Sequence, residues 1–308
     1  MRTLFLFMLS VSLFSCQDDD DFVEIINRNE PDDVPGLNWV EAEAGNFTGI
    51  YDSLIASLTA NPDITIVAEV DHARNASAAG MNLPPTRVVL FGNPRLGTPL
   101  MQANLRAGLD LPQKMLVYRA DDGDVIVAYN TPDYLARRHN VEGISTLSQI
   151  GTALQNFAEG AGGDSIETGA DAFPIRPGQG IITVTDTGTV DQVYDRLLTA
   201  LTDNPDISVI AELDHRANAA SVGLELPPSR LVVFGNPSLG TPLMADARST
   251  GIDLPQKMLV FQNAPGAVTI AYNDPSYLAD RHGLDDELEE VVTIGNALEQ
   301  LANTALGR

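Results

Sequence analysis

Runs of β-branched residues alternate with amphipathic stretches along the second half of the chain. The run 181–185 is typical of a strand, and Thr189 followed by Gln192 forms a capping box before apolar residues at helical spacing. Thr241-Pro242 resembles another helix start, with an N-cap followed by proline in the first turn. The pattern predicts strands at 181–185, 207–213, 231–234, 257–261 and 268–272, and helices beginning near 189, 214, 241, 274 and 286.

The order of these elements determines the fold class. Only the turn 263–266 separates the last two strands, so they must run antiparallel. The order β-α-β-α-β-α-β-β-α-α therefore predicts an α+β domain with helices on one face of a mostly antiparallel sheet. It does not fit a doubly wound parallel sheet.

An internal duplication defines the domains. Residues 51–139 align without a gap with residues 194–282, at an offset of 143, and 51 of the 89 positions are identical. We expect a first copy at 37–158 and a second copy at 179–308. The segment 159–178 between them is rich in glycine, proline and acidic residues and is interpreted as a linker.

The N-terminus has the features of an export signal. Residues 1–15 combine Arg2 with an apolar stretch that is too short to span a bilayer. The sequence Leu-Phe-Ser-Cys ending at Cys16 resembles the lipobox of bacterial lipoproteins. This resemblance implies a lipid on Cys16, with the membrane as a partner. The alternative is an ordinary secretory signal in which Cys16 has no role.

Residues 16–36 form an acidic tether containing Asp18–Asp21, which we expect to be extended and solvated. The acidic run is either a spacer or similar to the export signal of surface lipoproteins in some Gram-negative bacteria. The predicted location is the cell envelope, as an outer-membrane lipoprotein.

Composition restricts the partners. The chain of 308 residues carries 42 acidic and 18 basic residues, a formal charge of −24 and a pI near 4.2. Such a surface repels phosphate backbones, so we expect no nucleic-acid partner. A single cysteine excludes an internal disulfide framework and a multi-thiolate zinc site. A high acid content with few lysines is also typical of proteins adapted to high salt.

Long motifs occur in both copies. The first copy has Phe91–Met101, Asp110–Met115, Ala128–Asn130 and the group Tyr134, Leu135, Arg138 and His139, and the second repeats them 143 residues later. These motifs resemble the DUF302 family. The resemblance implies a two-layer α/β sandwich that tends to self-associate, and a family without an established activity. We therefore expect the two copies to pack as a pseudo-dimer.

The four histidines form two matched pairs, His72 with His139 and His215 with His282. Imidazole suits metal binding and proton transfer, and the preceding Asp71 or Asp214 is placed to orient a ring. The alternative is structural, with histidines that cap or bond locally. Because no H-x-x-x-H spacing or haem-attachment motif occurs, we expect no metal and no cofactor.

The lysines are also matched. Lys114 and Lys257 are the chain's two lysines and occupy equivalent positions, where we expect them to guard a sheet edge or reach solvent. The alternative is a lysine that pairs with a ligand. The helix after Phe91-Gly-Asn-Pro is expected to be capped by Thr98, with an anion site at its N-terminus as a further alternative. The candidate pocket comprises Asp71, His72, Lys114, Asn130, His139, Asp214, His215, Lys257, Asn273 and His282.

Three functions remain open. The leading hypothesis is a membrane-anchored extracytoplasmic module that binds or interacts with an unknown small molecule. The second is an enzyme using His72 with Asp71, and His215 with Asp214, as acid–base or metal-assisted groups. The third is a structural envelope protein. A covalent hydrolase is not expected, because no serine lies in a nucleophile elbow and the only thiol is the expected lipid site.

Overall fold

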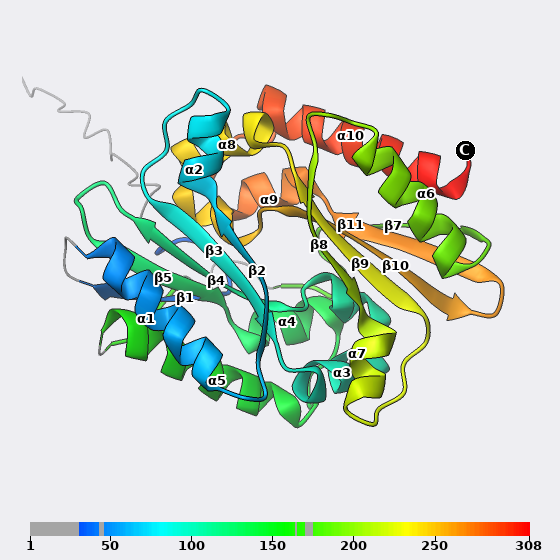
Figure 1. Ribbon diagram of the computed structural model, residues 1–308, viewed down its shortest axis with the longest axis horizontal. Coiled ribbons are helices and arrows are strands. Elements are labelled where there is room, and N and C mark those ends of the chain that lie inside the picture. The colour runs from blue at the N-terminus through cyan, green and yellow to red at the C-terminus, as the bar shows by residue number, and fades with distance from the viewer. Residues whose placement is uncertain (1–30, 43–45, 164, 170–174) are drawn as a thin grey trace, which may run out of the picture.

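A computed structural model describes residues 31–42, 46–163, 165–169 and 175–308 (Figure 1). The predicted signal peptide, Cys16 and the acidic run 18–21 lie outside the described residues. Within the described part, the chain forms two sheets, each with its own helices.

The first copy builds a six-stranded sheet in the order β2-β3-β4-β5-β1-β6. All of its strand pairs are antiparallel. Its elements are β1 (Leu37–Ala42), α1 (Phe47–Ala60), β2 (Thr65–Asp71), α2 (His72–Ala78), β3 (Thr86–Gly92), α3 (Pro94–Ala103), the 3-10 helix η1 (Leu105–Leu109), β4 (Gln113–Arg119), β5 (Val125–Asn130), α4 (Pro132–His139), α5 (Thr146–Gly162) and β6 (Glu167–Thr168).

The second copy repeats this plan in a five-stranded antiparallel sheet of order β7-β11-β10-β9-β8. Its elements are β7 (Ile181–Thr187), α6 (Val190–Thr202), β8 (Ser208–Asp214), α7 (His215–Ser221), β9 (Ser229–Gly235), α8 (Pro237–Asp246), the 3-10 helix η2 (Arg248–Ile252), β10 (Gln256–Ala264), β11 (Ala267–Asn273), α9 (Pro275–Arg281) and α10 (Glu289–Leu306). The predicted fold class, two tandem α+β domains with antiparallel sheets, is confirmed.

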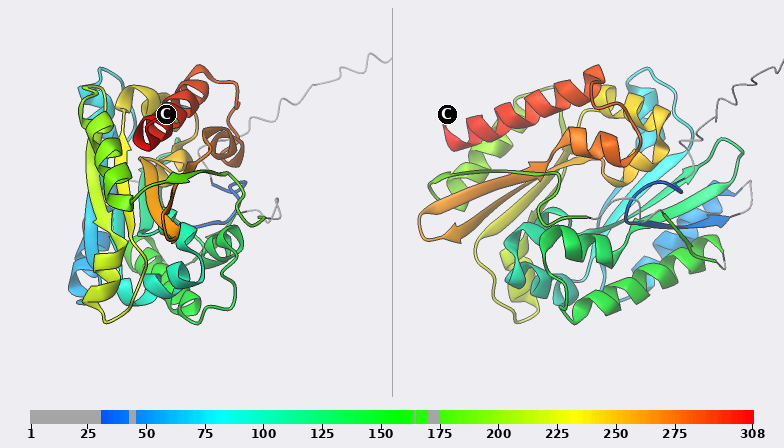
Figure 2. Two further views of the ribbon diagram at one scale, coloured as in Figure 1. Left: turned by 90° about the vertical axis from the view of Figure 1, so that its right-hand side faces the viewer. Right: turned by 180° about the vertical axis from the view of Figure 1, so that it is seen from behind.

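Each sheet buries its two faces in different ways. Helices α1 and α5 cover one face of the first sheet, and α6 and α10 cover the corresponding face of the second (Figures 1 and 2). Alternation along β4 produces both faces: Met115 and Val117 contact the helices, whereas Leu116 and Tyr118 point to the opposite side.

The opposite faces of the two sheets share one hydrophobic core. Side chains from both copies contribute to it, including Leu90, Leu116 and Tyr118 from the first and Leu231, Leu259 and Phe261 from the second. The 3-10 helices are exchanged: η1 packs on β9, β10 and β11, and η2 packs on β3, β4 and β5. Similarly, α2 lies beside α8, and α7 lies beside α3 (Figure 1). The copies therefore form a pseudo-dimer within one chain.

Two predicted helix starts are wrong. Helix α3 begins at Pro94 with Asn93 as its N-cap, and α8 begins at Pro237 with Asn236 as its N-cap. In both, the Asn side chain accepts from a backbone N–H and proline fills the first turn. Thr98 and Thr241 lie one turn further on, inside the helices.

The expected linker contributes to the first copy. Helix α5 continues into the segment 159–178 as far as Gly162. Strand β6, which also lies in this segment, pairs with β1 of the first copy. The last residues of the expected tether are also packed, because the carbonyl oxygen of Pro35 accepts hydrogen bonds from Arg281 of the second copy. Helix α10 begins three residues later than predicted and extends to Leu306.

Candidate functional site

Two cavities lie at equivalent junctions between the copies. The first, of about 440 Å³, combines Asp214 and His215 with the turn 91–98 and helix α5; we call it the His215 cavity. The second, of about 680 Å³, combines Asp71 and His72 with the turn 234–241 and helix α10; we call it the His72 cavity. Each cavity therefore takes its histidine from one copy and most of its remaining wall from the other.

The linings of the two cavities correspond almost residue by residue. The offset of 143 relates Asn93 to Asn236, Thr98 to Thr241 and Gln113 to Gln256. One pair differs strongly in size on the last helices, α5 and α10, where the offset is 144: Phe157 lines the His215 cavity and Leu301 lines the His72 cavity. Phe157 packs edge-on against Phe91 at 6.0 Å between ring centroids. The smaller leucine leaves more room in the His72 cavity.

Both cavity histidines are buried and electrically neutral at neutral pH. His72 and His215 each begin a short helix whose N-cap is the preceding aspartate. Burial lowers the pKa of each ring to about 4, because a charged imidazolium is poorly solvated there. The carboxylate of Asp71 accepts from the Arg74 backbone N–H and from Arg87 Nε, both at 2.9 Å. It is therefore engaged by groups other than the His72 ring.

The two rings differ in their hydrogen bonding. His215 Nε2 lies 3.2 Å from the carbonyl oxygen of Gly108 in η1, so the ring donates across the junction. His72 Nε2 is buried and has no hydrogen-bond partner among the described residues. At the equivalent glycine, Gly251, an added Cβ would meet Leu116 and Thr86, whereas at Gly108 it would meet Met101 and His215. The duplication has thus produced one satisfied and one unsatisfied cavity histidine.

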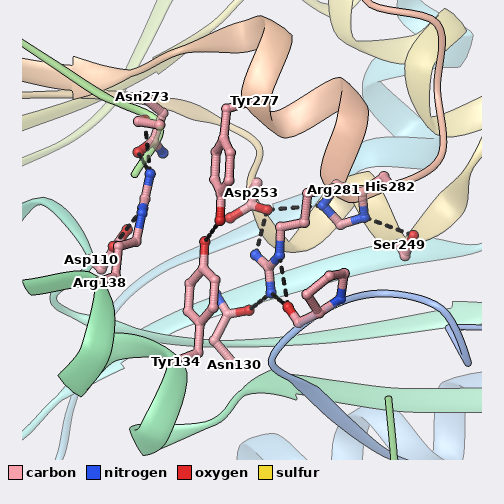
Figure 3. A network of polar contacts seen from close by, with 12 residues as sticks. Asp110, Asn130, Tyr134, Arg138, Ser249, Asp253, Asn273, Tyr277, Arg281 and His282 are labelled. Atoms are coloured by element: carbon pink, nitrogen blue, oxygen red, sulfur yellow. Dashed lines mark hydrogen bonds and ion pairs between the residues drawn. The ribbon is translucent and has the colours of Figure 1, made fainter. Parts of the chain in front are cut away.

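A second group of polar residues is buried at the centre of the pseudo-dimer (Figure 3). Asp110 accepts from Arg138 Nη1 at 2.7 Å, from His139 Nε2 at 2.8 Å and from Lys257 Nζ of the other copy at 3.2 Å. Arg138 also donates to Asn273 Oδ1 at 2.9 Å. Burial alone would raise the pKa of Asp110, but the charges of Arg138 and Lys257 and the hydrogen bond of His139 hold it well below its usual value.

The second copy supplies a matching cluster. Asp253 accepts from Arg281 Nη1 at 2.7 Å and from His282 Nε2 at 2.9 Å, and Arg281 donates to Asn130 Oδ1 at 2.7 Å. The hydroxyls of Tyr134 and Tyr277 meet between the clusters at 3.1 Å (Figure 3). Each arginine therefore binds an aspartate of its own copy and an asparagine of the other. This reciprocal pattern holds the two sheets in register.

The expectation that the lysines guard a sheet edge is wrong. Lys114 and Lys257 are 6% and 3% exposed, and they lie on β4 and β10, which have a neighbouring strand on both sides. Lys257 binds Asp110, whereas Lys114 Nζ has no hydrogen-bond partner among the described residues. Burial, with the nearby charge of Lys257, lowers the pKa of Lys114 well below its usual value.

The ten candidate residues are therefore distributed over three places. Asp71 and His72 line one cavity, and Asp214 and His215 line the other. The remaining six, Lys114, Asn130, His139, Lys257, Asn273 and His282, belong to the buried polar centre or lie beside it.

Sequence reasoning missed several partners. Asp110, Arg138, Asp253 and Arg281 carry the ionic contacts of the centre, and all four stand in the repeated motifs. Each aspartate and each arginine recurs at the offset of 143, and this recurrence is the signal by which the sequence could have identified them. In the part of the chain that the structure describes, no group of three or more His, Cys, Asp or Glu residues is arranged to hold a metal ion. No helix among the described residues has the length and apolar character needed to cross a membrane.

The fold and its buried centre define a duplicated α+β protein whose two copies complete each other. The chain belongs to the DUF302 family: the model of this family, described as "Domain of unknown function DUF302", matches residues 40–160 and 182–304.

Individual relatives match one part of the chain. "Fluoride-specific ion channel FluC 1" of Brucella suis biovar 1 (strain 1330) is 40% identical over 105 residues, which cover 34% of this chain and 41% of that protein. "Fluoride-specific ion channel FluC 2" of Brucella melitensis biotype 1 has the same identity over 38% of its length. The chain thus spans about two fifths of these curated relatives. An uncharacterized conserved DUF302 protein from Bacillus stearothermophilus aligns with a TM-score of 0.37 and 20% identity, over 41% of this chain and 98% of that one.

Proposed function

We propose that this protein is a binding module that holds small, largely apolar molecules in the two cavities between its copies. The observation that carries this proposal is the pair of equivalent cavities, each completed by a histidine from the opposite copy. Their volumes, about 440 and 680 Å³, lie within the range of ligand sites, roughly 300–1,000 Å³. Their walls are mainly apolar with a few polar groups, which is typical of such sites.

The electrostatics favour binding over acid–base catalysis. A histidine with a pKa of about 4 is a weak base at neutral pH, so His72 and His215 are poorly suited to proton transfer there. A neutral ring remains a good hydrogen-bond partner for a ligand. The duplication also supports this proposal. Each cavity is built from both copies, and their covalent linkage keeps each copy at a high effective concentration relative to the other.

The location is part of the same proposal. We infer that a lipid on Cys16 anchors the module at the cell envelope, where it would bind amphipathic molecules close to a membrane. The support is the lipobox-like sequence ending at Cys16, followed by an acidic segment. Intact mass spectrometry of the protein from its native membrane tests this. The expected mass is that of a chain beginning at a lipid-modified Cys16, and an unmodified N-terminus would contradict the anchor.

Binding itself is tested with 1-aminoanthracene, a small neutral dye whose fluorescence rises in apolar surroundings. We expect two dye molecules per chain. Ala153 and Ala297 are partly exposed, equivalent positions in the two cavities. Ala153→Trp and Ala297→Trp should each remove one dye site by filling one cavity. Ala60→Trp, at the exposed end of α1, is the control and should leave both sites. Absence of dye binding to the folded protein would refute the proposal.

A further inference from the structure

The His72 cavity contains an unusual set of unsatisfied polar groups. Three of its lining residues each have a buried polar atom without a partner among the described residues: His72 Nε2, Thr241 Oγ1 and Gln256 Oε1. These residues are 5%, 2% and 8% exposed, respectively. Leaving one such group unsatisfied costs about 1–3 kcal/mol, so three such groups on residues of one lining favour a ligand that would satisfy them.

The equivalent cavity does not share this feature. Of the described residues that line the His215 cavity, Gln113 is the one with such an atom, Nε2. His215 is satisfied by the carbonyl oxygen of Gly108. The contrast between two otherwise matched linings directs a ligand to the His72 cavity, where rotation of the side chains that carry these covered atoms would bring them into contact with it.

We infer that the His72 cavity binds an amphipathic small molecule whose uncharged head group both donates and accepts hydrogen bonds, such as a primary amide or an alcohol on a hydrocarbon body. This inference rests on the proposed function and specifies its ligand class. The Gln256 Oε1 atom requires a donor on the ligand, and the Thr241 hydroxyl can donate to an acceptor. An ionised carboxylate has no donor for Gln256. An ammonium can donate to Gln256 Oε1 and to the Thr241 oxygen, but it leaves the Thr241 proton without an acceptor.

The charges near the cavity disfavour an anionic head. The ring of His72 is neutral at pH 7 and cannot balance an anion. Among the lining residues, Asp71 is paired with Arg87, which leaves Glu69 and Asp206 against Arg74. Acidic side chains therefore still outnumber basic ones, which disfavours a carboxylate or phosphate.

The rest of the wall fits a hydrocarbon body. Its apolar side chains include Ile210, Phe234, Leu239, Met244, Leu254 and Ile294. Leu301, in place of the Phe157 of the other cavity, adds room along α10. Burial of each methylene group contributes roughly 0.8 kcal/mol in such surroundings, so a chain of several carbons would bind measurably.

The test uses the whole protein with octanamide and octanoate, which have hydrocarbon chains of the same length and differ in the head group. Each compound is titrated by displacement of 1-aminoanthracene. Octanamide should bind at least tenfold more tightly than octanoate at pH 7. Thr241→Val removes one unsatisfied hydroxyl with little change in volume and should weaken octanamide binding about tenfold, a difference of about 1.4 kcal/mol.

Thr146→Val is the matched control. Thr146 also has a buried hydroxyl without a partner among the described residues, but it lines neither cavity. This variant should bind octanamide as the parent does. If Thr241→Val fails to fold, Gln256→Met replaces it, with the same expected loss. Octanamide should also shift the imidazole nitrogen resonances of His72 at lower concentration than those of His215.

The outcomes separate this inference from the proposed function. If 1-aminoanthracene does not bind, the proposed function fails. If the dye binds but octanoate competes as well as octanamide, the inference is overturned while the binding function stands. Equal effects of Thr241→Val and Thr146→Val would overturn it in the same way, as would octanamide shifting the His215 resonances at lower concentration than those of His72.

Discussion

At the scale of single residues, the two lysines show that identical motifs acquire different roles after duplication. Both stand in the sequence Leu-Pro-Gln-Lys-Met, and both are buried. Lys257 Nζ lies 3.2 Å from Asp110 Oδ1, whereas Lys114 Nζ is without a hydrogen-bond partner among the described residues. The difference has an energetic consequence, because a buried amine without a partner destabilises the folded state.

Replacing each lysine with methionine measures this consequence. Lys257→Met should lower the free energy of unfolding by about 2 kcal/mol, because it removes a charge-assisted hydrogen bond to Asp110. Lys114→Met should be neutral or stabilising, since it removes a buried group that lacks a partner among the described residues. Urea unfolding at pH 7 gives both values. Equal losses in the two variants would contradict the assigned difference.

The cavity histidines predict acid sensitivity. The pKa of His72 is about 4 in the folded protein and near 6.5 when unfolded, so the unfolded state binds more protons between these values. The free energy of unfolding should therefore fall as the pH drops from about 6.5 to 4, by on the order of 3 kcal/mol for each such histidine. Asp110, whose folded pKa is lowered, adds a further loss only below about pH 4.

His72→Phe isolates this contribution. Because His72 Nε2 has no partner among the described residues, the variant removes the titrating group without removing a hydrogen bond of that nitrogen. Its stability should depend less steeply on pH between 6.5 and 4 than that of the parent, as measured by urea unfolding at several pH values. A nitrogen resonance of His72 that titrates near pH 6.5 would rule out this account.

These residues also show how far sequence reasoning reached. The repeat alignment identified the histidine and lysine pairs, because identical residues at one offset are visible in the chain itself. It did not identify their partners. Lys257 binds Asp110, and Arg138 binds Asn273, so the decisive contacts join different copies. Such contacts depend on how the two sheets pack against each other, and a local sequence pattern does not predict that packing.

At the scale of elements, helix starts are the clearest case in which two similar signals competed. Asn-Pro and Thr-Pro occur five residues apart in each copy, and both fit an N-cap followed by proline. The helices start at the first pair, where the Asn93 and Asn236 side chains accept from Arg95 and Ser238 N–H groups. The five strands of the second copy and the succession of elements along the chain were predicted well, because β-branched runs and turn residues are local signals.

The assignment of the cap is testable at α3. Asn93→Ala should lower the free energy of unfolding by about 1 kcal/mol, because the N–H of Arg95 loses its acceptor. Asn93→Ser is the control, since serine is also a good N-cap residue and should preserve most of the stability. Thermal and urea unfolding provide the measurement. If Asn93→Ala matches the parent, the side chain contributes nothing to the start of α3.

At the scale of the whole molecule, the two copies are packed into one structure. The inner faces of both sheets share a core, and each 3-10 helix packs on the sheet of the other copy. Arg138 and Arg281 each need oxygen atoms from outside their own copy, provided by Asn273 and Asn130. Separation of the copies would expose this core and leave buried charges with fewer partners, so we expect the copies to unfold together, although each also has a core of its own beneath its helices.

This organisation predicts that damage in one copy is felt in the other. Trp39 is the only tryptophan of the chain and lies in the first copy, in the shared core. Leu197 is fully buried in the second copy, on the inner face of α6 and away from the shared core. Leu197→Ala should destabilise the protein by about 2–5 kcal/mol. Because we expect the copies to unfold together, the urea midpoint reported by Trp39 fluorescence should fall as far as the midpoint reported by far-ultraviolet circular dichroism. A Trp39 transition that stays at its original midpoint while circular dichroism shows two steps would mean that the copies unfold independently, despite their shared core and exchanged helices.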